Sequence, residues 1–199
     1  MEQAESCIQL LPMLHRALMD EKQLIEGCIR NDRLCQEALF KRYAGKMKAV
    51  CMRYMRQRDE AEDVLQEGFI KLFKSLHQYT FQGSFEGWIR RIMVNTALTK
   101  MNRMSFKSEV DLIENYHDTF DFRDIIDTIS AKEIRNMIAE LPEGYRVVFN
   151  LYVVEGYSHK EIAETLGITE NTSRSQLLKA RLALQNKLKK TEIDIAHAS

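Results

Sequence analysis

Hydrophobic residues recur along most of the chain at the three- and four-residue spacing of amphipathic helices. In the first half this pattern predicts four helices, at about residues 21–29, 34–56, 59–76 and 84–102. The second of these should bury Leu39, Tyr43, Met47, Val50 and Tyr54. The third should bury Ala61, Leu65, Phe69, Leu72 and Leu76, with Asp59 and Glu62 forming a capping box at its start.

The second half of the chain begins with a further capping box, formed by Ser130 and Glu133. The helix that follows carries an apolar stripe of Ile134, Met137, Ile138 and Leu141. Pro142 stops this helix and suits the first turn of the next, which should end near Gly156. That next helix is expected to bury Val147, Val148 and Leu151.

A third capping box, Ser158 with Glu161, opens a short helix whose inward residues are Ile162, Ala163 and Leu166. Gly167 supplies a left-handed exit from this helix. Thr169 can cap a final helix that we expect to reach about residue 189. A short helix, a glycine-containing turn and a longer basic helix predict a helix-turn-helix.

Composition supports an all-α fold class of two small helical domains joined by an acidic linker, with the helix-turn-helix in the C-terminal domain. Two Pro and eight Gly are few for a sheet protein, which needs many turns. The predicted organisation is an N-terminal extension (1–20), a first domain (21–104), a linker (105–130), a second domain (131–190) and a tail (191–199).

Several features favour a cytoplasmic protein. No stretch approaches the roughly 20 apolar residues that cross a bilayer, and the first 18 residues lack the basic segment of a secretory signal. The four cysteines, Cys7, Cys28, Cys35 and Cys51, show no CxxC spacing and no His in ligand register. We therefore expect buried, reduced thiols and neither a metal nor a cofactor.

The net charge of zero argues against a nucleic-acid partner, but the distribution of the charges along the chain argues for one. Between Glu86 and Glu109 there are five bases and no acid, and between Glu170 and Glu192 six bases and no acid. Residues 106–131 instead carry seven acids against two bases. Each basic run alone could be a solvated helix face, but two of them around an acidic connector indicate a nucleic-acid partner.

The last helix divides into two stripes. Ser173, Leu177, Ala180 and Leu184 form the expected core stripe. The candidates for contact with DNA in the major groove are Thr172, Arg174, Ser175, Gln176, Lys179 and Arg181. Arg and Lys reach guanine acceptors or phosphates, Gln can read adenine, and hydroxyls bind phosphates. The alternative is a helical hairpin that packs on another protein.

Three motifs, in order, resemble those of extracytoplasmic-function sigma factors. The run Asp59-Glu-Ala-Glu-Asp-Val-Leu-Gln-Glu-Gly-Phe resembles their core-polymerase-binding helix. The run Phe81-Gln-Gly-Ser-Phe-Glu-Gly-Trp-Ile-Arg-Arg-Ile-Met-Val-Asn-Thr-Ala resembles their −10-reading segment. The segments that start at Leu141 and Glu155 resemble their fourth conserved region. The likeness covers about residues 21–104 and 131–189.

The resemblance implies a sigma factor that binds core RNA polymerase and directs it to promoter DNA. The residues that would face the polymerase are Asp59, Asp63, Gln66, Glu67 and Ile70. The residues that would bind the melted −10 element are Tyr79, Phe81, Phe85, Arg90, Arg91, Asn95 and Lys100. Trp88 is expected in the core with Ile89 and Ile92. The acids could instead simply complement a helix dipole, which accounts better for Glu60 and Glu62 than for Glu67.

The start of the recognition helix departs from the family pattern. Ser173 stands where the family often has an apolar residue, and Gln176 stands where it often has a base. The first departure bears on the core stripe, and the second weakens any transfer of −35 sequence preference. The family also implies control by an anti-sigma factor, and we expect no small-molecule substrate.

Two other classes of function remain as alternatives. A conventional regulator would bind an operator through the helix-turn-helix as a dimer and would not need polymerase. An enzyme is the least supported class, because the sequence has no nucleophile elbow, phosphate loop or HExxH motif.

Overall fold

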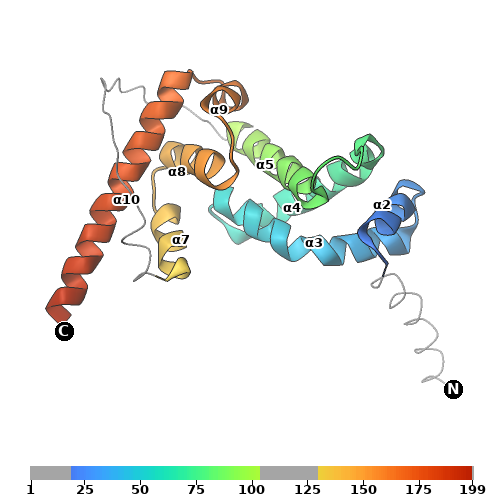
Figure 1. Cartoon of the computed structure of the whole chain (residues 1–199), viewed down its shortest axis with the longest axis horizontal. Coiled ribbons are helices and arrows are strands. Elements are labelled where there is room, and N and C mark those ends of the chain that lie inside the picture. Colours follow the sequence, from blue (N-terminus) through green and yellow to red (C-terminus); the bar gives the residue numbers. More distant parts are fainter. Residues whose placement is uncertain (1–18, 104–129, 199) are drawn as a thin grey trace. The chain divides into compact units, whose positions relative to one another are not determined.

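The computed structural model describes residues 19–103 and 130–198, with side chains up to 101 in the first range and up to 189 in the second. The predicted acidic linker and almost all of the N-terminal extension lie outside these residues. The chain divides into two compact units, Met1–Arg103 and Met104–Ser199 (Figure 1). In the described ranges every regular element is a helix, which confirms the all-α fold class, and none of these helices has the length and hydropathy to cross a bilayer.

The first unit contains α2 (Glu21–Ile29), α3 (Arg33–Tyr54), α4 (Arg58–Ser75), the short 3₁₀ helix η1 (Leu76–Gln78) and α5 (Phe85–Arg103). Helices α3, α4 and α5 pack on one another, and α2 lies against α3 and η1 (Figure 1). Both predicted core stripes of this unit, on α3 and on α4, are completely buried. Of the predicted core residues at the start of α5, Ile89 is buried, whereas Trp88 and Ile92 are only half-buried.

Side-chain caps determine where the first helices begin. The Asp20 carboxylate accepts a hydrogen bond from the backbone N–H of Gln23 at 2.7 Å, and Asp32 accepts one from the N–H of Leu34 at 2.9 Å. Both bonds satisfy amide groups that have no partner within their own helix. The helices α2 and α3 are therefore separated by a turn of three residues.

The predicted capping box at the start of α4 is wrong by two residues. The helix begins at Arg58, and the backbone N–H of Gln57 donates to the carboxylate of Glu60 at 3.4 Å. Glu62 instead pairs with Lys48 of α3 at 2.6 Å and with Arg58 at 3.0 Å. A Glu at the right spacing is not enough to predict a cap when a cation of a neighbouring helix competes for it.

The second unit contains α7 (Ala131–Ala139), α8 (Glu143–Phe149), the π-helical turn η2 (Asn150–Val154), α9 (His159–Leu166) and α10 (Glu170–Ala198). Helix α10 packs on α7, α8 and α9 (Figure 1). It extends to Ala198, beyond the expected end at about residue 189.

Both capping boxes predicted for the second unit are confirmed. The N–H of Glu133 donates to Ser130 Oγ at 3.3 Å, and the N–H of Ser130 donates to the Glu133 carboxylate at 2.9 Å. Ser158 and Glu161 repeat this exchange at 3.2 and 2.9 Å. Gly167 has φ +67°, the left-handed conformation expected at the end of α9.

The interior of the second unit is formed mainly by α8, α9 and α10. Val147, Val148 and Leu151 are fully buried, and the three inward residues predicted on α9 are buried as well. Of the stripe predicted on α7 only Leu141, just beyond the end of the helix, is buried. This helix therefore covers an edge of the core.

Candidate nucleic-acid interface

Helix α10 is the second helix of a helix-turn-helix, and α9 is the first. Thr169 caps it, because the N–H of Thr172 donates to Thr169 Oγ1 at 3.0 Å. The predicted core stripe is confirmed, since Ser173, Leu177, Ala180 and Leu184 are all buried. Ser173 has no exposed surface, and its hydroxyl lies 2.9 Å from Nδ1 of His159. The opposite face of α10 is consequently turned to solvent.

Five of the six candidates for major-groove contact reach the surface: Thr172, Arg174, Ser175, Lys179 and Arg181. Arg174 is exposed and pairs with Glu170, one turn before it, at 2.8 Å. The ammonium of Lys179 lies 6.0 Å from the centre of the Tyr145 ring. An exposed ion pair such as that of Arg174 with Glu170 contributes little to stability, so a phosphate can compete for Arg174.

Gln176 is a core residue and not the exposed base reader that the sequence predicts. Only 7% of its surface is exposed. Its side chain lies against α8, where a Cβ atom at Gly144 would come within 3.3 Å of the Gln176 Nε2. The amide oxygen has no hydrogen-bond partner. In this position the side chain contributes to packing and cannot reach a base.

In the first unit two of the aromatic residues near Gly83, Tyr79 and Phe85, are buried, and the half-buried Trp88 packs against them. The ring centres of Tyr79 and Phe85 are 5.0 Å apart, and those of Phe85 and Trp88 are 6.0 Å apart. The Tyr79 hydroxyl donates to the carbonyl of Gly83 at 2.9 Å, which closes the loop before α5. Phe85 is only 1% exposed. Tyr79 and Phe85 are therefore buried beneath the loop and support it, which corrects the expectation that they capture bases directly.

Phe81 differs from the other aromatic residues of this loop. It is 44% exposed and has φ +59°, in the left-handed region that bulky residues rarely adopt. Its ring packs on Tyr79 at 5.2 Å, and the ammonium of Lys22 lies 5.9 Å from the ring centre. Strained backbone of this kind persists where the surrounding structure imposes it, and it is concentrated at functional sites.

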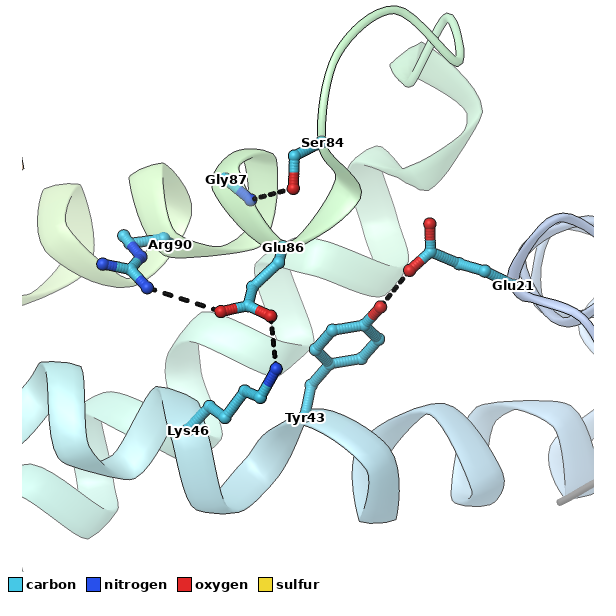
Figure 2. A network of polar contacts seen from close by, with 7 residues as sticks. All are labelled: Glu21, Tyr43, Lys46, Ser84, Glu86, Gly87 and Arg90. Carbon is cyan, nitrogen blue, oxygen red and sulfur yellow. Dashed lines mark hydrogen bonds and ion pairs between the residues drawn. The ribbon is translucent and has the colours of Figure 1, made fainter.

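A polar network connects the start of α5 with α3 and α2 (Figure 2). The Glu86 carboxylate accepts from Lys46 of α3 at 2.6 Å and from Arg90 at 3.4 Å, and the hydrogen bond from Lys46 is the main reason that the pKa of Glu86 is lowered. Tyr43 donates to Glu21 of α2, and burial together with this bond raises the pKa of Tyr43. Sequence analysis missed Lys46 and Glu86, because they are 40 residues apart and no local pattern connects them.

The remaining −10 candidates lie along α5. Arg91 and Asn95 are exposed. Lys100 is drawn towards α4, where its ammonium donates to Asp63 at 3.1 Å and to the carbonyl of Glu60 at 3.4 Å. A predicted DNA-contacting cation is thus paired with a predicted polymerase-contacting acid.

The outward face of α4 presents the predicted polymerase-binding side chains together. Asp59, Asp63 and Gln66 are exposed, and Glu67 is half-buried and pairs with Lys71 at 2.8 Å. Ile70 is 55% exposed, the most exposed large apolar side chain of the described residues. An acidic face with one protruding aliphatic residue suits a protein partner that carries basic side chains.

Comparisons with known proteins identify the family of the chain. Residues 39–105 match the Sigma-70 region 2 family, and residues 131–184 match the Sigma-70 region 4 family. The chain is 30% identical to the ECF RNA polymerase sigma-E factor of Haemophilus influenzae, over 85% of this chain and 96% of that protein. It is 31% identical to the protein of the same name in Escherichia coli, over 85% of this chain and 95% of that one.

Among solved structures, a similar chain is the sigma factor RpoE in complex with the anti-sigma factor NepR from Bartonella quintana. The TM-score is 0.48 and the identity 17%, over 77% of this chain and 96% of that chain. The two sigma-70 regions coincide with the two helical units, and sigma-E relatives match along nearly their whole length. The chain therefore belongs to the extracytoplasmic-function family of RNA polymerase sigma factors.

Proposed function

We propose that this sigma factor divides promoter recognition between its two units, with α10 reading the −35 duplex and the start of α5 binding the melted −10 strand. The observation that carries the proposal is the solvent face of α10, where polar and basic side chains stand opposite a fully buried stripe. Such a helix can enter the major groove while α9 braces it.

On α10 the DNA-contacting residues are Thr172, Arg174, Ser175, Lys179 and Arg181. Arg174 leaves Glu170 when it meets a base edge or a phosphate, because an exposed ion pair offers little resistance. The two hydroxyl residues add phosphate contacts. The buried Gln176 shapes the fit of α10 on α8 instead.

In the first unit, Phe81 supplies the exposed ring on which an unstacked base can lie, and Arg90, Arg91, Asn95 and Lys100 follow the strand along α5. Stacking on an aromatic side chain contributes about 1–3 kcal/mol per base. Tyr79 acts through the loop, because its ring packs on Phe81 and its hydroxyl bonds the carbonyl of Gly83, and Phe85 supports the Tyr79 ring.

The acidic face of α4 is the docking surface for core RNA polymerase, formed by Asp59, Asp63, Gln66, Glu67 and Ile70. The protein performs no covalent chemistry of its own and acts in the cytoplasm, where the polymerase is. Membership of the family also makes an anti-sigma factor the expected partner of the free chain. Such a partner would compete with core polymerase, and competition binding with a candidate partner tests this.

Association with core polymerase tests the α4 surface. The variant Asp63→Arg/Glu67→Arg reverses two charges on the docking face and should abolish association, because like charges then meet. The control Glu37→Arg/Glu164→Arg makes the same change in charge at exposed positions outside the proposed surfaces and should bind normally. Normal assembly by the first variant would contradict the docking surface.

Binding to duplex DNA tests α10. The probe is a duplex that the full chain selects from a randomised library. Arg174→Ala/Lys179→Ala should weaken binding and reduce the slope of log affinity against log salt by about 0.9 for each phosphate that the variant no longer neutralises. The control Lys132→Ala/Arg135→Ala removes the same charge from exposed positions of α7. Equal slopes in the parent and the first variant would contradict the assignment of α10.

A further inference from the structure

The first buried residue of the recognition helix is polar, and this needs a physical reason. Ser173 has no exposed surface, so its hydroxyl cannot exchange its partner for water. A buried hydroxyl without a hydrogen bond is costly. Its backbone N–H already donates to Thr169 at 3.0 Å within the helix turn. The hydroxyl finds its partner in another element, in Nδ1 of His159 at 2.9 Å.

His159 is itself held in one orientation. It is the first residue of α9, and its ring stacks on that of Tyr152, with centres 4.5 Å apart and planes inclined by 22°. Desolvation by burial, followed by the positive charge of Arg174, lowers the pKa of His159, which favours the neutral ring. The Nδ1 of a neutral imidazole either accepts a hydrogen bond from the Ser173 hydroxyl or donates one to it, so the bond forms in both tautomers.

The contact joins the beginnings of the two helices of the helix-turn-helix. His159 opens α9 and Ser173 lies in the first turn of α10, 14 residues further on. An apolar contact at this place would allow α10 to slide or rotate slightly. A hydrogen bond is directional, and a buried one is strongly favoured over any arrangement that breaks it.

We propose that the hydrogen bond between His159 and Ser173, backed by the Tyr152 ring, is a positioning device that fixes α10 on α9 and thereby determines how selectively α10 reads DNA. The inference rests on the proposed −35 function of α10. Both residues act through the helix that carries Arg174 and its neighbours, and neither is assigned a contact with DNA.

The experiment measures discrimination, the ratio of the affinities of the full chain for the library-selected duplex and for its scrambled counterpart. Ser173→Ala and His159→Phe each remove one side of the bond, and the phenylalanine keeps the stack on Tyr152. Each should reduce discrimination by about threefold to tenfold, since interactions between contacting residues typically have this size. Binding to the scrambled duplex should change little.

The double variant Ser173→Ala/His159→Phe distinguishes a coupled pair from two independent residues. Because the bond is already absent in either single variant, the double variant should lose no more discrimination than the worse single one. His159→Asn provides the rescue, since an amide oxygen can take the place of Nδ1, and it should retain more discrimination than His159→Phe. The control Thr165→Ala removes a hydrogen bond within α9, to the carbonyl of Glu161 at 2.6 Å, and should leave discrimination unchanged.

Additive losses in the double variant, or unchanged discrimination in both single variants, would overturn the proposal. A decrease of about one in the salt slope of His159→Phe would also overturn it, because it would show a direct phosphate contact. Circular dichroism of each variant verifies the fold, and Ser173→Ala, which removes the other side of the bond, keeps the test available if His159→Phe does not fold. If Arg174→Ala/Lys179→Ala leaves binding intact, the −35 function has failed. If only the His159 and Ser173 variants are without effect, the positioning role alone has failed.

Discussion

The interiors of the two units are built in different ways. Among the described residues of the first unit, Thr96 is the buried polar side chain, and the rest of the core is apolar, aromatic or sulfur-containing. Cys28, Cys35 and Cys51 belong to this core as buried thiols. The described part of the second unit buries four polar or charged side chains: Arg146, Asn150, Ser173 and Gln176. The described part of the first unit packs three long helices, α3, α4 and α5, on one another, whereas the second packs three short helices on the single long α10.

Long helices supply enough apolar contact to define their own packing. In the first unit α3 has 22 residues and α4 has 18. In the second unit α7, α8 and α9 have only seven to nine residues, which is too short for independent stability. Buried polar contacts there, such as the hydrogen bond between Ser173 and His159, add direction to the packing. The unit proposed to read duplex DNA is thus the one with more buried polar side chains among the described residues.

The largest expected effect concerns the aromatic core of the first unit. Phe85→Ala should lower the free energy of unfolding of this unit by about 3–5 kcal/mol, because it leaves a cavity between Tyr43, Tyr79 and Trp88. Hydrogen exchange, followed separately in each unit, measures this change in the free energy of unfolding. The exposed Phe81→Ala is the control and should cost far less. Equal losses in both units would contradict the picture of two separate cores.

A second test compares two glycines of the first unit. A Cβ atom at Gly68 would come within 2.3 Å of the Met93 sulfur, whereas one at Gly45 would meet nothing within 4 Å. Gly68→Ala should therefore destabilise the unit by about 1–3 kcal/mol. Gly45→Ala should stabilise it by about 0.5–1 kcal/mol, since alanine is the better helix former. Urea denaturation measures both, and the same sign for both variants would contradict tight α4–α5 packing.

In the second unit, replacing Gly167 should lower the free energy of unfolding through backbone conformation and not through a steric clash. Gly167 has φ +67°, and a Cβ atom there would meet nothing within 4 Å. Gly167→Ala should destabilise the unit by about 1–2 kcal/mol, the cost of a left-handed alanine. Thermal unfolding gives the value. An unchanged melting temperature would mean that the turn can adopt another conformation.

The smallest expected effect is a dependence on pH. The folded-state pKa of His159 lies below its ordinary value of 6.5, with burial as the main cause and Arg174 and Arg181 acting in the same direction against Glu170. The unfolded chain therefore binds the proton first as the pH falls. The corresponding stability is present above the unfolded pKa and is lost as the pH falls through the folded value.

Denaturation of the parent chain at several pH values should show a loss of stability of the second unit as the pH falls below the ordinary histidine value of 6.5. The variant His159→Phe should show a flatter profile over the same range. Parallel profiles would show that the buried ring is not responsible.

The elements of the second unit were predictable because their signals are local. Ser130 with Glu133, Ser158 with Glu161, and Gly167 each determine a helix end through residues at most three positions apart. The same holds for the core stripes of α9 and α10, whose period is that of the helix itself, but not for α7, where only Leu141 of the predicted stripe is buried.

The errors concern tertiary contacts. Gln176 is polar, yet it lies four residues before Ala180 on the same buried face, and the missing side chain of Gly144 makes room for it. Phe85 precedes a run of cations in the sequence, but Tyr43 of α3 and Tyr79 pack against its ring. Competition from Lys48 for Glu62 likewise comes from another helix. Such partners are visible only in the folded chain.

The decisive experiment is transcription reconstituted from core RNA polymerase, the full chain and genomic DNA. We expect defined start sites that depend on this chain, that disappear with Asp63→Arg/Glu67→Arg, and that weaken with Arg174→Ala/Lys179→Ala. A chain that binds DNA as a dimer but never causes core polymerase to start at a defined site would contradict this expectation.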